Sequence, residues 1–414
     1  MSNVNHLKNR RLLRHLPPTA VPVQLGDVGS GLAALWQPQD AVERLRLALM
    51  ARTGSQACHL LGSAREALTV ILLGLKRLST RTQVIVPAYG CPTVVQAVLE
   101  ADLQPVLCDV SPRTLDLDRK ALRSLIGEEV LAIVPTHLYG LAQDVRDLLE
   151  IGREYGIVVI EDAAQAFGAT FQGRMVGTWG DAGLYSLGRS KCIPAGHGGA
   201  LVCQEQYAAM ISDTMQKAIT GRANRDLASL ALFTAYGLAT HPVGWWFVAR
   251  TPLNPADEGM DLGDLAPIHL RGISAVQAGI GASILERLDG IQATSRQNAR
   301  QLMDRLAEFT FVRWPTIPAG AEPVFLRLPL VVEGEEVANR LFDRLWEAGI
   351  GVSRSYWRTL ADLFSEELGT DEQDYPGAAR LARCLLTLPT HTYLKQDDFA
   401  RISRAFRTVD SQGG

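Results

Sequence analysis

The sequence contains few of the residues that build metal clusters or disulfide frameworks. Only six of its 414 residues are cysteines, and no two of them stand in a CxxC arrangement. We therefore expect neither a metal site nor a fold held together by disulfides. An excess of charge of one sign is missing as well, because 41 basic residues face 44 acidic ones. This balance argues against a nucleic-acid coat or a strongly basic membrane binder, and we predict no nucleic-acid partner.

Lysine is scarce, and the N-terminus has no signal-peptide pattern. The chain has 35 arginines but only six lysines, so chemistry that needs an amine has few candidates. The lysines are Lys8, Lys76, Lys120, Lys191, Lys217 and Lys395. The first residues are basic but lack a continuous apolar core and a small-residue cleavage site, so we expect a cytoplasmic protein.

What the chain does contain is a regular alternation of short apolar runs and helical patterns between about residues 55 and 205. The runs at 84–89, 105–110, 131–140, 157–164, 183–187 and 199–203 predict strands, and stretches such as 65–78 and 144–156 predict helices. This alternation predicts an α/β fold with a mostly parallel mixed sheet flanked by helices. The last two runs are close together, which favours an antiparallel pair. In such sheets the functional groups gather at the carboxyl ends of the strands.

After about residue 265 the pattern changes. Long helices are expected within 273–309, followed by further elements that alternate between strand and helix. The expected strands are 324–332 and 384–394, and the expected helices are 336–350 and 397–409. We therefore divide the chain into an N-terminal arm (1–38), a large domain (39–265) and a smaller C-terminal α+β domain (266–414).

An uncharged segment, 227–249, forms an apolar insertion near the end of the large domain, with Arg222, Arg225 and Arg250 on its flanks. One interpretation is a buried helix pair at a domain or subunit interface. A second is a segment that docks on a membrane surface, with tryptophans at the level of the headgroups. A third is a transmembrane helix, although a glycine, a polar Thr-His pair and a proline interrupt the segment.

Three polar groups follow strands of the predicted sheet. Glu161, Asp162 and Gln165 end one strand; a carboxylate there can face a ligand ring, or these acids are solvated or cap a helix. Lys191 lies in a Gly-rich turn with Ser186, where an amine can become nucleophilic and form a Schiff base, or is merely solvated.

The third group lies where a helix is expected to begin, at Ser63. Backbone N–H groups at a helix N-terminus bind phosphate, and Ser63 and Arg65 can add contacts, or Ser63 is a plain N-cap. Together, an amine, an acid that faces a ring and a phosphate site are what pyridoxal 5′-phosphate (PLP) requires.

At these residues the chain resembles, almost from end to end, the DegT/StrS-type family of PLP-dependent sugar aminotransferases, a fold-type-I group. The resemblance rests on the motifs SAREAL (63–68), VPAYGCPTVVQAV (86–98), VPTHLYG (134–140), EDAAQAFGA (161–169) and GDAGLYSLGRSKCIPAGHGGALV (180–202). It implies that Lys191 is the catalytic Schiff-base lysine and that Asp162 pairs with the pyridinium nitrogen. It further implies that Gln165 contacts the ring hydroxyl and that Ser186 binds the phosphate.

The resemblance is less definite at other positions. Ala64 and Arg65 stand where the family usually has Gly-Thr, yet their N–H groups can still hold phosphate. Asn224 is the nearest candidate for the asparagine that the family supplies to the phosphate of a neighbouring subunit. The aromatic residue that stacks on the ring is open: Cys91 aligns with that position, and Tyr89 is two residues away.

His137 and His197 are candidate substrate contacts, and a satisfied strand-end histidine is the alternative for His137.

The family's activity implies a homodimer that transfers an amino group from an amino acid such as glutamate to a keto-sugar. The sugar is expected to be nucleotide-linked and to serve surface polysaccharide or secondary-metabolite biosynthesis. Lys191 places the chain with the aminotransferases, because one branch of the family has histidine there and performs dehydration. Two alternatives remain: a PLP enzyme that acts on a lipid-linked or other apolar acceptor at a membrane through 227–249, and a non-catalytic PLP-binding regulator.

Overall fold

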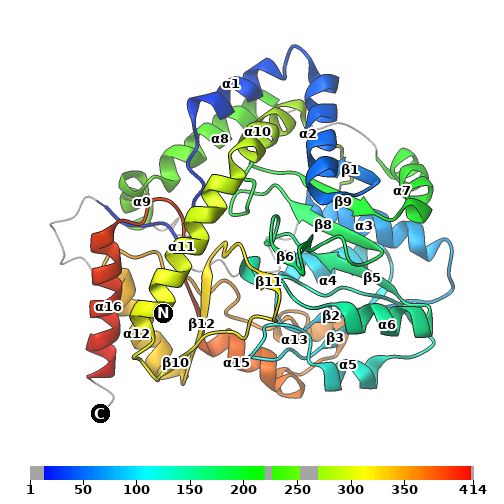
Figure 1. Ribbon diagram of the computed structural model, residues 1–414. Helices are drawn as coiled ribbons and strands as arrows, with labels where there is room; N and C mark the ends of the chain where they lie inside the picture. Colours follow the sequence, from blue (N-terminus) through cyan, green and yellow to red (C-terminus); the bar gives the residue numbers. More distant parts are fainter. Residues whose placement is uncertain (1–13, 220–225, 252–268, 412–414) are drawn as a thin grey trace.

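A computed structural model describes residues 14–219, 226–251 and 269–411 and centres on a seven-stranded sheet (Figure 1). The strand order is β1-β9-β8-β5-β4-β2-β3. The strands are β1 (Ala57–Leu61), β2 (Gln83–Pro87), β3 (Gln104–Cys108), β4 (Val130–Ile133), β5 (Val158–Asp162), β8 (Ala182–Ser186) and β9 (Gly199–Cys203). Strands β3, β2, β4, β5 and β8 run parallel, whereas β9 pairs antiparallel with β8 and with β1. The predicted mixed sheet and the antiparallel pair are confirmed.

Helices cover both faces of this sheet, and successive side chains of each strand point to opposite faces. In β2, Val84 and Val86 pack in one core cluster with α3 and α4, whereas Ile85 packs in another with α5 and α6. The helices are α3 (Ala64–Lys76), α4 (Pro92–Glu100), α5 (Arg119–Leu125), α6 (Arg146–Tyr155) and α7 (Glu205–Ala218). Continuous apolar runs in the sequence therefore mark strands that are covered on both sides.

A second, antiparallel sheet of three strands lies in the C-terminal part. It consists of β10 (Val312–Arg313), β12 (Leu328–Val332) and β13 (Leu385–Leu388), with α12 (Glu335–Glu347), α15 (Pro376–Cys384) and α16 (Gln396–Asp410) nearby. The strand expected from residue 324 begins only at Leu328, since Phe325 has a positive φ of 48° that no strand tolerates. The strand expected over 384–394 ends at Leu388, and the carbonyls of Thr390 and His391 accept hydrogen bonds from Asn298 instead.

The shorter elements fill the edges of the two sheets. A small sheet combines β6 (Thr170–Phe171), β7 (Arg174–Met175) and β11 (Ala321–Glu322). Short helices are η1 (Leu138–Gly140), α13 (Leu360–Leu363), α14 (Ser365–Leu368) and η3 (Glu372–Asp374). The long helices expected within 273–309 are α10 (Ala275–Glu286) and α11 (Leu288–Leu306). Helix α10 packs on α1 (Leu25–Ala33) and α2 (Pro38–Thr53), which precede the expected domain boundary near residue 265. That boundary stays a prediction.

The uncharged segment forms two helices, α8 (Asp226–Thr240) and α9 (Pro242–Val248). Helix α8 lies beside α10 and α1 (Figure 1), and its inner face buries Leu230 and Phe233. Its outer side is apolar yet exposed: Leu232 is 67% and Leu238 71% accessible. The helix pair is therefore only half buried. None of the helices among the described residues is long and apolar enough to cross a membrane.

An N-terminal strap, residues 14–23, contacts α16, the turn after α12 and the start of α9. The carboxylate of Asp398 accepts from Arg14 Nη1 (2.6 Å), the Leu16 N–H donates to the Gly349 carbonyl (2.9 Å), and the His15 N–H donates to the Pro242 carbonyl (3.0 Å). Because the Tyr393 N–H donates to Nδ1 of His391 (3.3 Å), the proton of that ring is on Nε2 and donates to the Pro17 carbonyl (2.9 Å).

This strap makes the fold sensitive to acid. Burial lowers the pKa of His391 from 6.5 to about 4. Between these pH values the unfolded chain binds a proton at His391, whereas the folded chain keeps the ring neutral. Stability contributed by the neutral ring is complete above pH 6.5 and is lost as the pH falls towards 4, by about 3 kcal/mol. We expect urea midpoints to fall steeply over this range. The His391→Gln variant keeps a donor for Pro17 and should show a flatter profile; an equally steep one would contradict the assignment.

Candidate active site

The two neighbouring acids at the end of β5 have different surroundings. Strand alternation turns Glu161 and Asp162 to opposite sides of the sheet. Glu161 is fully buried, and its Oε1 accepts from the N–H groups of Trp179 (2.6 Å) and Gly180 (2.7 Å). Its Oε2 accepts from the N–H of Gly177 (2.9 Å). The carboxylate thus fastens the loop before β8 and has a structural role.

His137 completes the coordination of Glu161. Its Nε2 lies 2.9 Å from Glu161 Oε2, and the Gln143 N–H donates to its Nδ1 (3.1 Å). Nδ1 is therefore unprotonated, and Nε2 donates to the carboxylate. With both nitrogens engaged and no exposed surface, His137 is a satisfied buried histidine. This geometry contradicts the predicted substrate contact, because no ring atom is left to meet a ligand.

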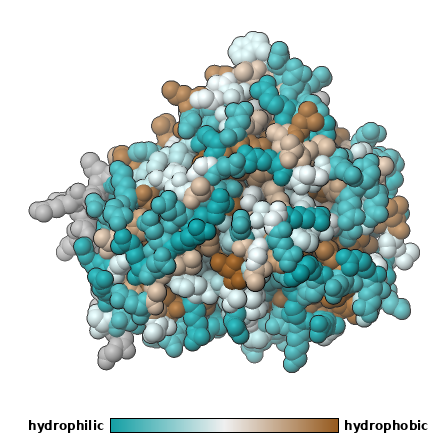
Figure 2. Space-filling view, viewed as in Figure 1, coloured by the Kyte–Doolittle hydropathy of each residue, from teal (hydrophilic) through white to brown (hydrophobic). Residues whose placement is uncertain are grey.

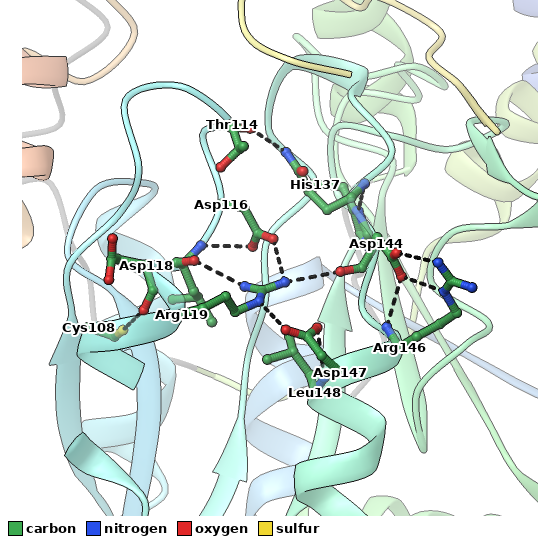
Figure 3. Close-up of polar contacts among 12 residues, drawn as sticks. Cys108, Thr114, Asp116, Asp118, Arg119, His137, Asp144, Arg146, Asp147 and Leu148 are labelled. Atoms are coloured by element: carbon green, nitrogen blue, oxygen red, sulfur yellow. Dashed lines mark hydrogen bonds and ion pairs between the residues drawn. The ribbon is translucent and has the colours of Figure 1, made fainter. Parts of the chain in front are cut away.

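A polar network ties the loop that follows β4 to the residues after β3 (Figure 3). Arg119 donates to Asp116 (2.8 Å), to Asp147 (2.6 Å) and to the carbonyl of Asp144 (3.0 Å). Burial raises the pKa of the Asp116 carboxyl, and the Arg119 guanidinium opposes that rise. Gln143 Nε2 also donates to the Thr114 carbonyl (2.8 Å). Because the Gln143 N–H also donates to Nδ1 of His137, this network supports the edge of the His137 ring that faces away from Glu161.

Asp162, in contrast, is available to a ligand. Its side chain is nearly buried, and its Oδ1 accepts from the Ala164 N–H (3.0 Å). Burial raises the pKa of Asp162, while the Ala164 N–H and the nearby ammonium of Lys191 oppose that rise. The carboxylate is therefore poorly solvated, and a cation placed against it would be stabilised.

Lys191 lies on the same edge of the sheet, in the loop between β8 and β9. The loop turns through a hydrogen bond from the Lys191 N–H to the Gly188 carbonyl (3.2 Å). Ser186, the last residue of β8, accepts from the Gly188 N–H (3.2 Å). The side chain of Lys191 is half-buried, and its ammonium acts electrostatically on Asp162 and on Cys192. The predicted amine and the predicted acid are thus brought together.

The predicted phosphate site is a helix N-terminus packed against the glycines of the same loop. Ser63 is the N-cap of α3 and accepts from the Glu66 N–H (3.1 Å), so the plain N-cap reading of its side chain holds. Ala64 and Arg65 are the first two residues of α3, so their N–H groups have no partner within the helix backbone. Gly199 packs so closely that an added Cβ would meet the Ser63 carbonyl carbon at 2.3 Å. The Arg65 guanidinium donates to Gln96 on α4 (2.5 Å).

A cluster of tyrosines lies beside Gln165. Gln165 Oε1 accepts from the Tyr139 N–H (3.0 Å), and its Nε2 donates to the Tyr356 hydroxyl (2.8 Å). Tyr89 is fully buried, with its hydroxyl 3.1 Å from that of Tyr139 and its ring edge-to-face with Tyr356 at 5.5 Å. Burial raises the pKa of Tyr89 and of Tyr356 well above 10, so both phenols stay protonated.

Tyr356 is a site residue that sequence reasoning missed. It is 191 positions from Gln165, so no local pattern indicates their contact. Behind it lies the buried guanidinium of Arg327, whose Nη1 donates to the hydroxyls of Ser353 (3.1 Å) and Ser355 (2.9 Å). The C-terminal part of the chain therefore contributes to the site directly.

Three further predicted site residues are Cys91, His197 and Asn224. Cys91 is the N-cap of α4, and its sulfur lies 3.0 Å from the Thr93 hydroxyl. His197 is an exposed residue of the lysine loop. Asn224 lies outside the described residues. Neither Tyr89 nor Cys91 is distinguished as the stacking residue by these contacts.

Comparison with known proteins identifies the family. The sequence profile of the DegT/DnrJ/EryC1/StrS aminotransferase family matches residues 34–234 and 268–407. The chain belongs to this family. It is an aminotransferase that uses PLP, as the resemblance implied, and the alternative of a non-catalytic regulator is set aside.

Related proteins of known activity cover most of the chain. L-glutamine:scyllo-inosose aminotransferase from Streptomyces griseus is 28% identical over 401 residues, which cover 91% of this chain and 88% of that protein. The dTDP-3-amino-3,4,6-trideoxy-alpha-D-glucose transaminase of Micromonospora megalomicea subsp. nigra is 30% identical over 335 residues, or 79% and 78% of the two chains.

Solved structures share the fold. The sugar aminotransferase CalS13 from Micromonospora echinospora superposes with a TM-score of 0.74 at 23% identity, over 95% of this chain and 99% of that one. DesV from S. venezuelae, solved with a ketimine intermediate, gives a TM-score of 0.70 at 22% identity, over 92% and 94%. The predicted fold class is confirmed.

The described residues of this aminotransferase fit PLP. The amine of Lys191 shares the sheet edge with the carboxylate of Asp162, whose pKa is raised by burial. The tight packing of Gly199 on the start of α3 leaves helix N–H groups free of a side chain that would cover them. An amine, an acid and the helix N-terminus that is predicted to bind phosphate therefore lie at one edge of the sheet, at the carboxyl ends of β8, β5 and β1.

Proposed function

We propose that this aminotransferase transfers an amino group from an amino acid, glutamate or glutamine, to the keto group of a sugar or cyclitol. The observation that supports this most is the convergence of Lys191 and Asp162 beside the α3 N-terminus. The matched relatives act on scyllo-inosose and form a dTDP-linked amino sugar, which favours polyhydroxylated keto substrates. A nucleotide-linked keto-sugar of polysaccharide or secondary-metabolite biosynthesis remains the acceptor we predict.

Each residue has a role that its position supports. Lys191 binds PLP covalently and then moves the proton between the donor carbon and the cofactor. Asp162 keeps the ring nitrogen protonated, and Gln165, oriented by Tyr139 and Tyr356, contacts the ring hydroxyl. When bound, PLP supplies an electron sink for the carbanion formed at the donor carbon.

The phosphate is held by groups from two elements. The Ser186 hydroxyl at the end of β8 and the N–H groups of Ala64 and Arg65 at the start of α3 face the same Gly-rich loop. Ser63 keeps these N–H groups in place as the N-cap. We also propose a homodimer in which Asn224 reaches the partner's phosphate site.

The test is a two-stage amino-transfer assay. The purified protein, loaded with PLP, is mixed with glutamate or glutamine, and the visible absorbance and the keto acid formed are measured. Scyllo-inosose or dTDP-linked keto-sugars are then added, and the amine product is detected by mass spectrometry. We expect the absorbance band of the lysine-bound cofactor to bleach with donor and to return with acceptor. A band that no amino acid changes would refute the proposal.

A second candidate function is favoured by the exposed apolar side of α8 and α9. Leu232, Leu238 and Phe247 are each 60–71% accessible, and Arg250 lies over the Trp246 ring at 4.1 Å. This arrangement suits an enzyme held at a membrane surface, where an apolar or lipid-linked acceptor is delivered.

Vesicle flotation tests the membrane contact. We expect the double variant Leu232→Asp/Leu238→Asp to bind anionic vesicles at least about tenfold more weakly than the wild type, because two leucines no longer enter the interface. Leu78→Asp changes an equally exposed leucine, 71% accessible, on α3's C-terminal side and should bind as the wild type does. A wild-type protein that never floats with vesicles would exclude this function.

A further inference from the structure

Helix α8 contacts the lysine loop directly. The hydroxyl of Tyr236 donates a hydrogen bond to the backbone carbonyl of Arg189. Arg189 is two residues before Lys191 and lies in the turn that the Lys191 N–H closes on the Gly188 carbonyl (3.2 Å). The contact therefore restrains the peptide between Arg189 and Ser190, immediately before Lys191.

Tyr236 lies outside the residues that match the family profile. The match to the family ends at residue 234 and resumes at residue 268. The second half of α8 and all of α9 lie between these limits. The contact between Tyr236 and the lysine loop is thus made by a residue outside the matched ranges.

Helices α8 and α9 are held firmly by the rest of the chain. The inner face of α8 buries Leu230 and Phe233 against neighbouring helices, and α8 packs on α10 and α1 (Figure 1). Gly237, next to Tyr236, lies so close to the strap that an added Cβ would meet the Val23 side chain at 2.7 Å. The His15 N–H donates to the Pro242 carbonyl (3.0 Å) at the start of α9. A hydroxyl on this surface has little freedom to follow a moving loop.

The loop itself is tied to its own strands at its base. The Leu187 N–H donates to the Gly198 carbonyl (2.8 Å), and the Ala195 N–H donates to the Leu187 carbonyl (2.9 Å). Gly196 and Gly198 have φ values of 92° and 122°, which residues other than glycine rarely adopt, and Cys192 and Ile193 are buried in the core. The conformation of the loop around Arg189 depends more on contacts with residues outside the loop, and Tyr236 provides one.

We propose that Tyr236 is a positioning residue for Lys191: by holding the Arg189 carbonyl, it fixes the turn that directs the lysine amine towards Asp162. The role of Lys191 rests on the proposed function, whereas the restraint on the loop does not. Removal of the hydroxyl alone should therefore loosen the loop and misplace the amine without unfolding the helix.

Hydrogen–deuterium exchange of the cofactor-free protein tests the restraint. In Tyr236→Phe we expect the amides of residues 188–191 to exchange about three- to tenfold faster, which is the effect of losing one ordinary hydrogen bond. Exchange in α3 and α10 should not change. The control is Thr234→Val, which removes a hydroxyl from the same helix that donates only to the Leu230 carbonyl (2.9 Å). Equal loop exchange in both variants would overturn the proposal.

A second readout connects the restraint to the amine. The pH at which the absorbance of the lysine-bound cofactor changes should shift in Tyr236→Phe and stay constant in Thr234→Val, because the surroundings of the Lys191 nitrogen change only in the first. An unshifted midpoint would refute a positioning role. If the wild type shows no such band, the proposed function fails, while the exchange result still decides whether Tyr236 restrains the loop.

Discussion

In the Lys191→Ala variant we expect no covalent attachment of PLP and a loss of amino transfer from the donor of about 10³-fold or more. The amine both binds the cofactor and moves the proton, and general acid–base groups alone contribute 10²–10⁴-fold. Chemical rescue is the sharper measurement. A small added amine such as methylamine can restore part of the proton transfer, although it cannot restore attachment to the protein.

The matched control for this prediction is Lys217→Ala. Lys217 is an exposed lysine of α7 whose ammonium pairs with Asp213 at 2.8 Å, four residues earlier on the same helix. Its removal should leave the absorbance and the rate unchanged, since surface pairs of this kind contribute little. If Lys191→Ala retained the absorbance band of lysine-bound cofactor, another lysine would have to be the attachment site.

The adjacent acids Glu161 and Asp162 should respond in opposite ways to the same chemical change. Glu161→Gln keeps the shape of the side chain but puts an amide NH2 against N–H donors that now converge on a carboxylate. We expect a loss of about 3–5 kcal/mol in the free energy of unfolding, because a buried charge-assisted network is broken. His137, bonded to Glu161 at 2.9 Å, loses its partner at the same time.

Asp162→Asn should instead keep the cofactor-free protein folded. Burial raises the pKa of the Asp162 carboxyl, so ionisation of the wild type lowers the free energy of unfolding as the pH rises above the usual range for an aspartate. The asparagine variant has no such loss at pH 7. Amino transfer should nevertheless fall by about 10²-fold or more, because a neutral amide cannot keep the ring nitrogen protonated. Urea unfolding and the donor reaction, measured on both variants, separate the two roles. A stable, inactive Glu161→Gln would reverse our assignment.

Much of the sheet can be predicted from sequence because strands covered on both faces are apolar at successive positions. The expected strand at 199–203 agrees with β9 at both ends. The expected strand 131–140 is too long, since β4 ends at Ile133 and the chain then turns, with Tyr139 at a φ of 57°. Apolar residues continue through this turn because it is buried, so hydrophobicity alone cannot show where the strand ends.

The site is predictable where chemistry is local and unpredictable where it depends on distant contacts. Lys191 is conspicuous because lysines are rare and glycines surround it. The sequence cannot distinguish Glu161 from Asp162, since both are acids at the end of one strand; only the orientation of β5 and the loop before β8 separates them. Tyr356 and Tyr236 carry no local signal, because each acts on an element far away in the chain.

The strap of residues 14–23 has a consequence for how the protein is made on the ribosome. The first described residue, Arg14, pairs with Asp398, and Pro17 accepts its hydrogen bond from His391. The strap is therefore synthesised long before His391 and Asp398, and it cannot make these contacts until both have emerged from the ribosome. Until then the strap lacks these contacts. A chain whose translation stops before residue 391 therefore has neither anchor for its strap.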